Sequence, residues 1–104
     1  MKTYEKETVA DLIRQIDEIR NETSLTFSQL RVLIGILTVE ENGDLAKPGR
    51  LARQVGVSAP AVTSACDNLV RRGFVARSQR GMSGLEDRRE VVLTTTEKSR
   101  VLFR

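Results

Sequence analysis

The sequence of 104 residues contains no histidine, no tryptophan and only one cysteine. Histidine is the most frequent general base and a common metal ligand, so its absence removes the usual centre of a catalytic or metal site. One cysteine cannot form an intrachain disulfide and leaves no CxxC pair for a metal. Because the remaining residues form no catalytic constellation either, we expect a protein that is not an enzyme and uses no cofactor.

Long apolar runs are also absent, since none approaches the roughly 20 residues that cross a bilayer. Residues 1–5 lack the apolar core of a signal peptide. We therefore expect a cytoplasmic protein without membrane contact. The length suits a single domain, residues 1–104, whose core needs no metal or disulfide.

Charge is divided unevenly along the chain. Residues 1–44 hold five Lys/Arg and nine Asp/Glu, a net charge of −4, whereas residues 45–104 hold twelve and five, a net charge of +7. A basic half of this kind is typical of a nucleic-acid binder, although charge alone also fits an ordinary solvated surface.

Residues 58–73 have the pattern of a helix that enters a DNA groove. Ser58 is a good N-cap, Pro60 falls in the first turn, and Gly73 suits the left-handed residue after a helix. One face is apolar and predicts burial of Val62, Ala65, Cys66 and Leu69. The other face is small or polar and ends in a basic residue, as a major-groove helix requires: Ala61, Ser64, Asn68 and Arg71.

Two further helices are predicted towards the N-terminus. Apolar residues recur at three- and four-residue spacing over residues 4–20, which indicates an amphipathic helix followed by a polar break at 21–24. Thr26 and Gln29 form the pattern of a capping box. The run after them, residues 30–37, is apolar almost all round and predicts a central buried helix.

A short helix over residues 48–55, ended by Gly56, precedes the 58–73 segment and completes a helix-turn-helix. Thr96 is placed to cap a last helix within residues 96–104. Between these parts the period changes to that of a hairpin, with strands at 74–77 and 90–94 and a tip at 78–86. The predicted fold class is mainly α with a small β-hairpin wing, a winged helix-turn-helix.

An ordered set of motifs runs from residue 24 to residue 100: Leu25-Thr26 with Gln29, Leu51-Ala52, Gly56-Val57-Ser58, Val62-Thr63, Leu69, Gly73, Val75, Arg77 and Asp87-Arg88-Arg89. In this order and spacing the set resembles the MarR family of bacterial transcription regulators. The resemblance implies a homodimer that binds a pseudo-palindromic operator, with recognition helices in successive major grooves and wings at the flanking minor grooves.

Three features depart from the family pattern. Thr95-Thr96 and Ser99 replace a Leu-Thr pair and a glycine at the exit of the hairpin, and Ser64 stands where a basic residue usually follows the recognition threonine. The family also continues into a long C-terminal helix that makes much of its dimer interface, of which residues 96–104 supply about two turns.

We nevertheless expect a homodimer, because one recognition helix reads too few base pairs to select a site in a genome. The candidate surface is apolar and comprises Val9, Leu12, Ile13, Ile16, Ile19, Val101, Leu102 and Phe103. In the alternative, the first helix packs back on Leu33 and Leu37 of its own subunit.

The expected DNA contacts form two groups. The recognition helix would supply Ser58, Ala59, Pro60, Thr63, Ser64, Asn68 and Arg71, with Asn68 reading adenine or contacting a phosphate. The wing would supply Arg77, Arg80, Asp87, Arg88 and Arg89; the resemblance places Arg89 in the minor groove and lets Asp87 orient it or a neighbouring arginine. Either group alternatively forms an ordinary solvated surface. Other cations fit phosphate contacts or mere solubility: Lys47, Arg50, Arg53 and Arg72.

These observations predict a sequence-specific double-stranded DNA-binding transcriptional regulator, a repressor that occupies its operator. The alternatives are a plasmid partition, replication or phage-type accessory winged-helix protein, and a winged helix used only for protein contact. Cys66 is predicted to be a small buried apolar residue rather than a redox sensor. With one Tyr and three Phe, an aromatic effector pocket has few candidate residues.

Overall fold

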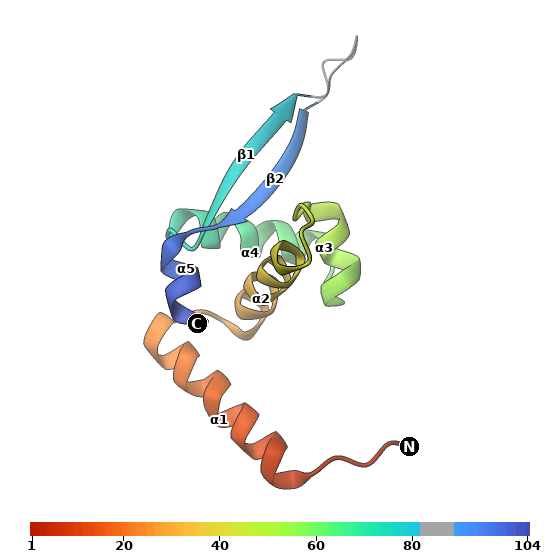
Figure 1. The fold of residues 1–104 in the computed structure, drawn as a ribbon, viewed down its shortest axis with the longest axis vertical. Coiled ribbons are helices and arrows are strands. Elements are labelled where there is room, and N and C mark those ends of the chain that lie inside the picture. Colours follow the sequence, from red (N-terminus) through yellow and green to blue (C-terminus); the bar gives the residue numbers. More distant parts are fainter. Residues whose placement is uncertain (82–88) are drawn as a thin grey trace.

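The computed structural model describes the backbone of residues 1–81 and 89–104, and the side chains of residues 1–79 and 91–104. The described residues form five helices and one antiparallel pair of strands, so the predicted winged helix-turn-helix is confirmed (Figure 1). In chain order these elements are α1 (Lys6–Thr23), α2 (Phe27–Glu41), α3 (Pro48–Val55), α4 (Ala59–Arg71), β1 (Val75–Gly81), β2 (Arg89–Thr95) and α5 (Glu97–Leu102).

Helix α2 lies at the centre of the core, as its apolar sequence predicts. Its capping box is confirmed, because Thr26 Oγ1 accepts from Gln29 N at 3.1 Å and Gln29 Oε1 accepts from Thr26 N at 2.9 Å. The buried residues of α2 are Leu30, Val32, Leu33, Ile36 and Val39. Burial is not complete all round, however, since Phe27 and Ile34 remain 47% and 39% exposed along one side of the helix.

Helices α3 and α4 form the predicted helix-turn-helix. Gly56 ends α3 with φ of 71°, and Ser58 Oγ accepts from Ala61 N at 3.3 Å to cap α4. Arg31 of α2 donates to the carbonyl of Val55. This carbonyl lies at the end of α3, where carbonyls lack a partner within the helix, so the bond connects α3 to the central helix. The inward face of α4 is confirmed as predicted: Val62, Ala65, Cys66 and Leu69 are buried.

The strands of the hairpin are longer than predicted. β1 runs to Gly81 and β2 begins at Arg89, with Val75 opposite Thr95 and Arg80 opposite Glu90. Residues 78–81, predicted as part of the tip, are therefore strand; their weak strand propensity is outweighed by pairing with the β-branched partner strand. Leu93 N also donates to the Ala46 carbonyl at 2.8 Å, which attaches the hairpin to the body.

Hydroxyl groups hold the exit of the hairpin, where the sequence departs from the family pattern. Thr95 is buried and donates to the Glu40 carboxylate through its amide, at 3.2 Å, and its hydroxyl. The fully buried Ser99 donates through Oγ to the Phe74 carbonyl at 2.6 Å. Thr96 precedes α5 as predicted but does not cap it through its side chain, because its hydroxyl donates to the Gly73 carbonyl at 2.6 Å instead.

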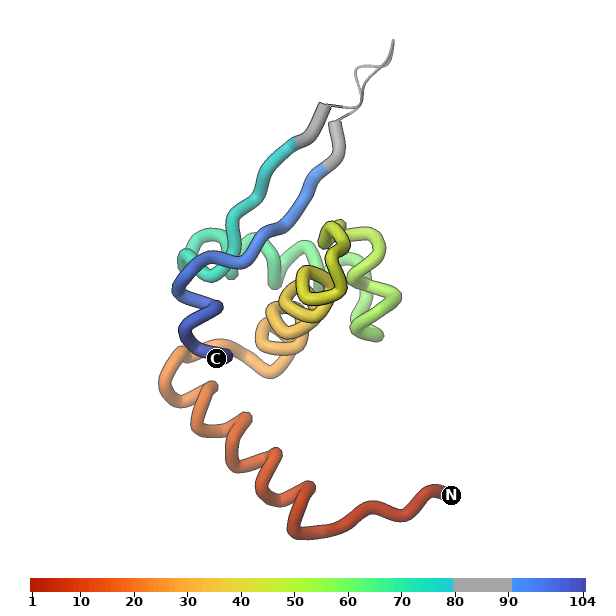
Figure 2. The backbone as a smooth tube through the Cα atoms, viewed as in Figure 1, coloured from red at the N-terminus to blue at the C-terminus, as the bar shows by residue number. Residues whose placement is uncertain are grey.

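Helix α1 extends away from the body as an arm (Figures 1 and 2). It runs to Thr23 rather than ending at residue 20, and the predicted polar break shrinks to Ser24, whose φ of 59° turns the chain. No residue of α1 is buried, so this helix is not laid over Leu33 and Leu37. Within the described residues, no helix is long and apolar enough to cross a membrane.

Candidate nucleic-acid interface

The outward face of α4 is the centre of the candidate interface. Six of its residues are exposed: Ala59, Pro60, Thr63, Ser64, Asp67 and Arg71. Five of these were predicted from the sequence, and Ser58, also predicted, is exposed at the cap. The helix begins in this exposed stretch, so its positive dipole end faces solvent and suits a phosphate.

Hydrogen bonding within α4 restricts what Thr63 can recognise. Its hydroxyl donates to the Ala59 carbonyl at 3.1 Å, so the proton of the hydroxyl is already used. The oxygen still carries acceptor capacity, which matches the amino groups that adenine and cytosine present in the major groove.

Asn68 is less open than a residue of the outer face. It is half-buried, and its Oδ1 is enclosed without a hydrogen-bond partner among the described residues. The reason is that position 68 lies at the edge of the exposed face, close to the buried row. Its contact with DNA stays a prediction, and the enclosed Oδ1 does not favour reading of adenine.

An ion pair between the recognition helix and the wing was not predicted. Arg77 Nη2 of β1 lies 2.6 Å from Asp67 Oδ1 of α4, with the side chains 37% and 55% exposed. Arg77 was predicted to contact DNA, and the structure places its guanidinium on an acidic residue of the recognition face. Spacing could have revealed Asp67, because it follows Ser64 by three residues and therefore shares its face.

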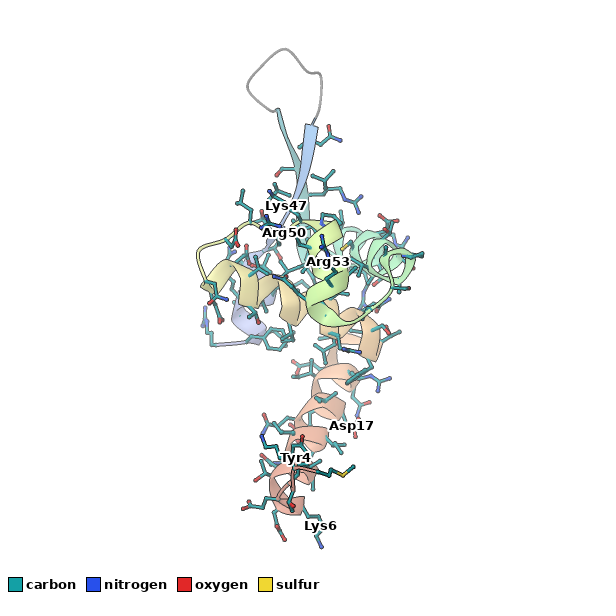
Figure 3. All side chains as sticks on the ribbon, turned by 90° about the vertical axis from the view of Figure 1, so that its right-hand side faces the viewer. Tyr4, Lys6, Asp17, Lys47, Arg50 and Arg53 are labelled. Atoms are coloured by element: carbon teal, nitrogen blue, oxygen red, sulfur yellow. The ribbon has the colours of Figure 1, made fainter. Side chains whose placement is uncertain are left out.

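Further basic side chains lie on α3 and just before it. Figure 3 shows Lys47, Arg50 and Arg53 on one side of the body below the hairpin, at the opposite end of the molecule from the Asp17 side chain of α1. Arg50 and Arg53 are exposed, and Arg50 Nη1 lies 3.9 Å from an oxygen of Asp44. The arm α1 and these cations thus lie apart, whereas Asp44, which belongs to the acidic part of the sequence, lies beside Arg50 in the body.

The outer wing residues are placed by backbone register. Arg80 pairs with Glu90, and Arg89, the first residue of β2, pairs with Gly81. Arg89 is six residues from Thr95 at the base of the hairpin, a distance of about 20 Å along a strand. The predicted contacts Asp87 and Arg88 lie outside the described residues.

Arg72 was predicted as a phosphate contact or a solubilising charge, and it is neither free nor directed outward. Its guanidinium donates to the Thr23 carbonyl and, at 3.3 Å, to the Ser24 carbonyl at the end of α1. Phosphate contacts by Lys47, Arg50 and Arg53 stay predictions.

Cys66 is buried, as predicted, at 1% exposure. Burial raises the pKa of its thiol, and the nearby charges of Arg77 and Asp67 act in opposite directions on it. A buried thiol with a raised pKa is the reverse of a reactive sensor. Among the described residues, no group of three or more His, Cys, Asp or Glu side chains could hold a metal.

An open apolar groove of about 550 Å³ runs along the exposed side of α2. Its lining includes Ile16 of α1, Phe27 and Ile34 of α2 and Val55 of α3. Phe27 is the aromatic residue in it, which agrees with the small aromatic content of the sequence.

A sequence model of the MarR family matches residues 23–90. None of the curated protein sequences matches the chain. Similar solved structures include a possible transcriptional regulator from Methanosarcina mazei Go1, with 19% identity, a TM-score of 0.65 and coverage of 83% of this chain and 68% of that one. The S. aureus MepR–DNA complex has 16% identity, a TM-score of 0.69 and coverage of 93% and 73%. Apo wild-type MarR from E. coli has 21% identity, a TM-score of 0.63 and coverage of 97% and 73%. At these identities the structures share the fold.

Proposed function

The chain belongs to the MarR family of DNA-binding transcription regulators, and we propose that it is a repressor that occupies a pseudo-palindromic operator as a homodimer. The observation that carries the proposal is the outward face of α4, which is small and polar and lies beside the basic side chains of α3. A face of this size and polarity fits the major groove, and flanking cations fit the phosphates on its two sides.

The division of roles follows from the side chains. Thr63 and Ser64 are short and exposed on α4, so they let the helix lie deep and contact base edges. Ser58 and the first turn of α4 offer a helix N-terminus to a phosphate. Arg71, Arg50 and Arg53 supply phosphate contacts, which position the protein without reading sequence.

The hairpin is proposed to carry Arg89 to the minor groove beside the helix. Its place about 20 Å from the hairpin base suits a contact beyond the major groove that α4 occupies. A narrow minor groove concentrates negative potential and attracts an arginine.

The proposed dimer is supported by the exposure of α1. Leu12 and Ile13 are 53% and 54% exposed, and Val101 near the C-terminus is 48% exposed. An apolar stripe left uncovered on an arm is rarely tolerated in a monomer, and a second copy of the arm would cover it. Because α1 is acidic and lies opposite the basic end, its pairing leaves the DNA-binding face open.

Genomic binding-site mapping followed by titration of the recovered duplex tests the proposal. We expect sites that overlap promoters, an inverted-repeat symmetry, and reduced transcription when the site is occupied. Affinity should fall steeply with salt, by about one power of ten per tenfold salt for each phosphate contacted. Binding that is insensitive to salt, or sites arrayed beside a replication origin, would contradict the repressor.

Arg89→Ala tests the wing separately from the helix. We expect binding to weaken by roughly 1–3 kcal/mol, with loss of preference for A/T-rich flanks. Arg104→Ala removes the same charge from the C-terminal residue and should bind like the parent. Equal binding by Arg89→Ala and the parent would show that the wing assignment is wrong.

A further inference from the structure

Arg72 joins the recognition helix to the arm. It is the C-cap residue of α4, it is half-buried, and its two terminal nitrogens donate to the consecutive carbonyls of Thr23 and Ser24. The last carbonyls of a helix lack partners within the helix and carry partial negative charge, so the forked guanidinium is a matched donor for the end of α1.

The guanidinium is itself held in place. It lies over the ring of the buried Phe74, 5.5 Å from its centroid, and Lys98 Nζ lies 4.3 Å from the same centroid. Lys98 also donates to the Arg72 carbonyl at 3.0 Å, and Ser99 donates to the Phe74 carbonyl. Arg72 is therefore fixed at a joint where the end of α4, the start of β1 and α5 meet.

The other side-chain hydrogen bonds from α1 to the described residues after it lie in the adjacent turn: Arg20 Nε donates to the Leu25 carbonyl at 3.4 Å, and Thr23 Oγ1 accepts from Leu25 N at 3.2 Å. None of its residues is buried, and Figures 1 and 2 show it leaving the body at its C-terminal end. At that corner, Ser24 adopts a φ of 59° and its amide donates to the Arg20 carbonyl at 2.7 Å. The corner fixes where the arm begins, and the two hydrogen bonds from Arg72 connect the end of the arm to the end of α4.

We propose that Arg72 is a positioning residue that sets the angle between α1 and α4 and thereby the half-site spacing that the dimer accepts. The proposal rests on the proposed function, in which α1 forms the dimer and α4 reads DNA. An 18-residue helix is about 27 Å long, so a swing of about 10° moves its far end by about 5 Å. That displacement exceeds the rise of about 3.4 Å per base pair of DNA. The angle between α1 and α4 would therefore select the number of base pairs between the two half-sites.

The test compares binding to duplexes in which two copies of the mapped half-site are separated by different numbers of base pairs. The parent should prefer one spacing, near 10 base pairs or a multiple, by about tenfold or more over spacings two base pairs away. Arg72→Ala should flatten this ratio to about threefold or less while its affinity for a single half-site stays within about twofold. Arg104→Ala removes the same charge elsewhere and should keep the parent's spacing profile.

Arg72→Lys separates geometry from charge. A lysine keeps the positive charge, but its single ammonium cannot reproduce the two-pronged guanidinium that bonds two carbonyls. The spacing preference should therefore broaden, as in Arg72→Ala. If Arg72→Ala does not fold by circular dichroism, Arg72→Lys decides alone. An unchanged spacing ratio in the folded variants overturns the proposal, as does an equal loss of affinity at every spacing. A parent that binds single and double half-sites equally overturns the proposed dimer instead.

Discussion

At the scale of single residues, Asp67 is the least expected feature of the interface. It places a carboxylate in the middle of the face that is proposed to enter the groove, where it would repel phosphates. Arg77 neutralises that charge across a distance of 2.6 Å, and in doing so it is held against α4. If α4 enters the groove as proposed, we expect the pair to lower general attraction to DNA and to leave selectivity to the short polar residues beside it.

Asp67→Asn should therefore strengthen binding to an unrelated duplex. Loss of the carboxylate releases Arg77 to contact a phosphate, and the slope of log affinity against log salt should steepen by about one. Titrations of a labelled random duplex at several salt concentrations measure both effects. Asp17→Asn makes the same change on α1 and should leave the slope unaltered. A parental slope in Asp67→Asn would mean that loss of the carboxylate adds no phosphate contact by Arg77, which contradicts the prediction.

Cys66 yields a prediction about reactivity and pH. Because burial raises the pKa of its thiol, the unfolded chain loses this proton first as pH rises. The contribution of this thiol to the free energy of unfolding is therefore complete below the ordinary thiol pKa. It is lost as the pH rises through the raised pKa of the folded protein. A thiol reagent at pH 8 should modify the native protein at least about 100-fold more slowly than the urea-unfolded chain, since exposure requires opening of the core. Rapid modification of the native protein would contradict the buried assignment.

At the scale of elements, the close approach of α2 and α3 positions the helix-turn-helix. A Cβ at Gly35 would lie 3.1 Å from Val55 Cγ2 and 3.6 Å from Leu51 Cδ2, both on α3. Glycine at this position lets the two helices meet closely, and α3 in turn supports α4. The position of the helix-turn-helix therefore depends on the absence of a side chain at Gly35 of α2.

Gly35→Leu should lower the free energy of unfolding by about 1–3 kcal/mol, because the added side chain forces α2 and α3 apart. Urea titration measures the change. The matched control is Gly49→Ala in α3, where a Cβ meets no heavy atom within 4 Å. That change should be neutral or stabilising by up to about 1 kcal/mol, through helix propensity alone. A Gly35→Leu protein as stable as the parent would show that the helices have room to separate.

At the scale of the whole molecule, the long axis separates two kinds of surface. The basic α3 side chains lie near the wing, and the acidic arm α1 projects from the other end over a total extent of 56 Å. Such a layout allows two copies to meet through their arms while both recognition helices face DNA.

Sedimentation equilibrium should show a dimer of the parent chain at micromolar concentration. Ile13→Asp places a charge in the exposed apolar stripe of α1 and should shift the equilibrium to monomer by at least about tenfold. Asn21→Asp adds one negative charge to the exposed side of α1 away from this stripe and should stay dimeric. If the parent is a monomer throughout this range, the proposed dimer is wrong.

Features that depend on one helical turn could be predicted from the sequence. Four such features are the Thr26–Gln29 capping box, the Ser58 cap, the bounds of the third helix and the buried face of α4, each built from steps of no more than four positions along the chain. Backbone geometry alone brings such residues together, so caps and apolar spacing carry enough information. By the same reasoning the sequence was sufficient to predict the fold class.

The interactions that organise the site depend on tertiary structure instead. Arg72 meets the Ser24 carbonyl across 48 positions, and the Asp67–Arg77 pair joins a helix to a strand. The sequence shows each of these arginines only as a positive charge. It does not tell whether the side chain binds a phosphate, a carbonyl or a carboxylate. Its partner is decided by how the elements pack, because a charged side chain is held by whichever oppositely polarised group the fold places within its reach. The direction of α1 and the length of the strands could not be predicted for the same reason. Each depends on contacts with residues distant in the sequence, which local sequence patterns do not contain.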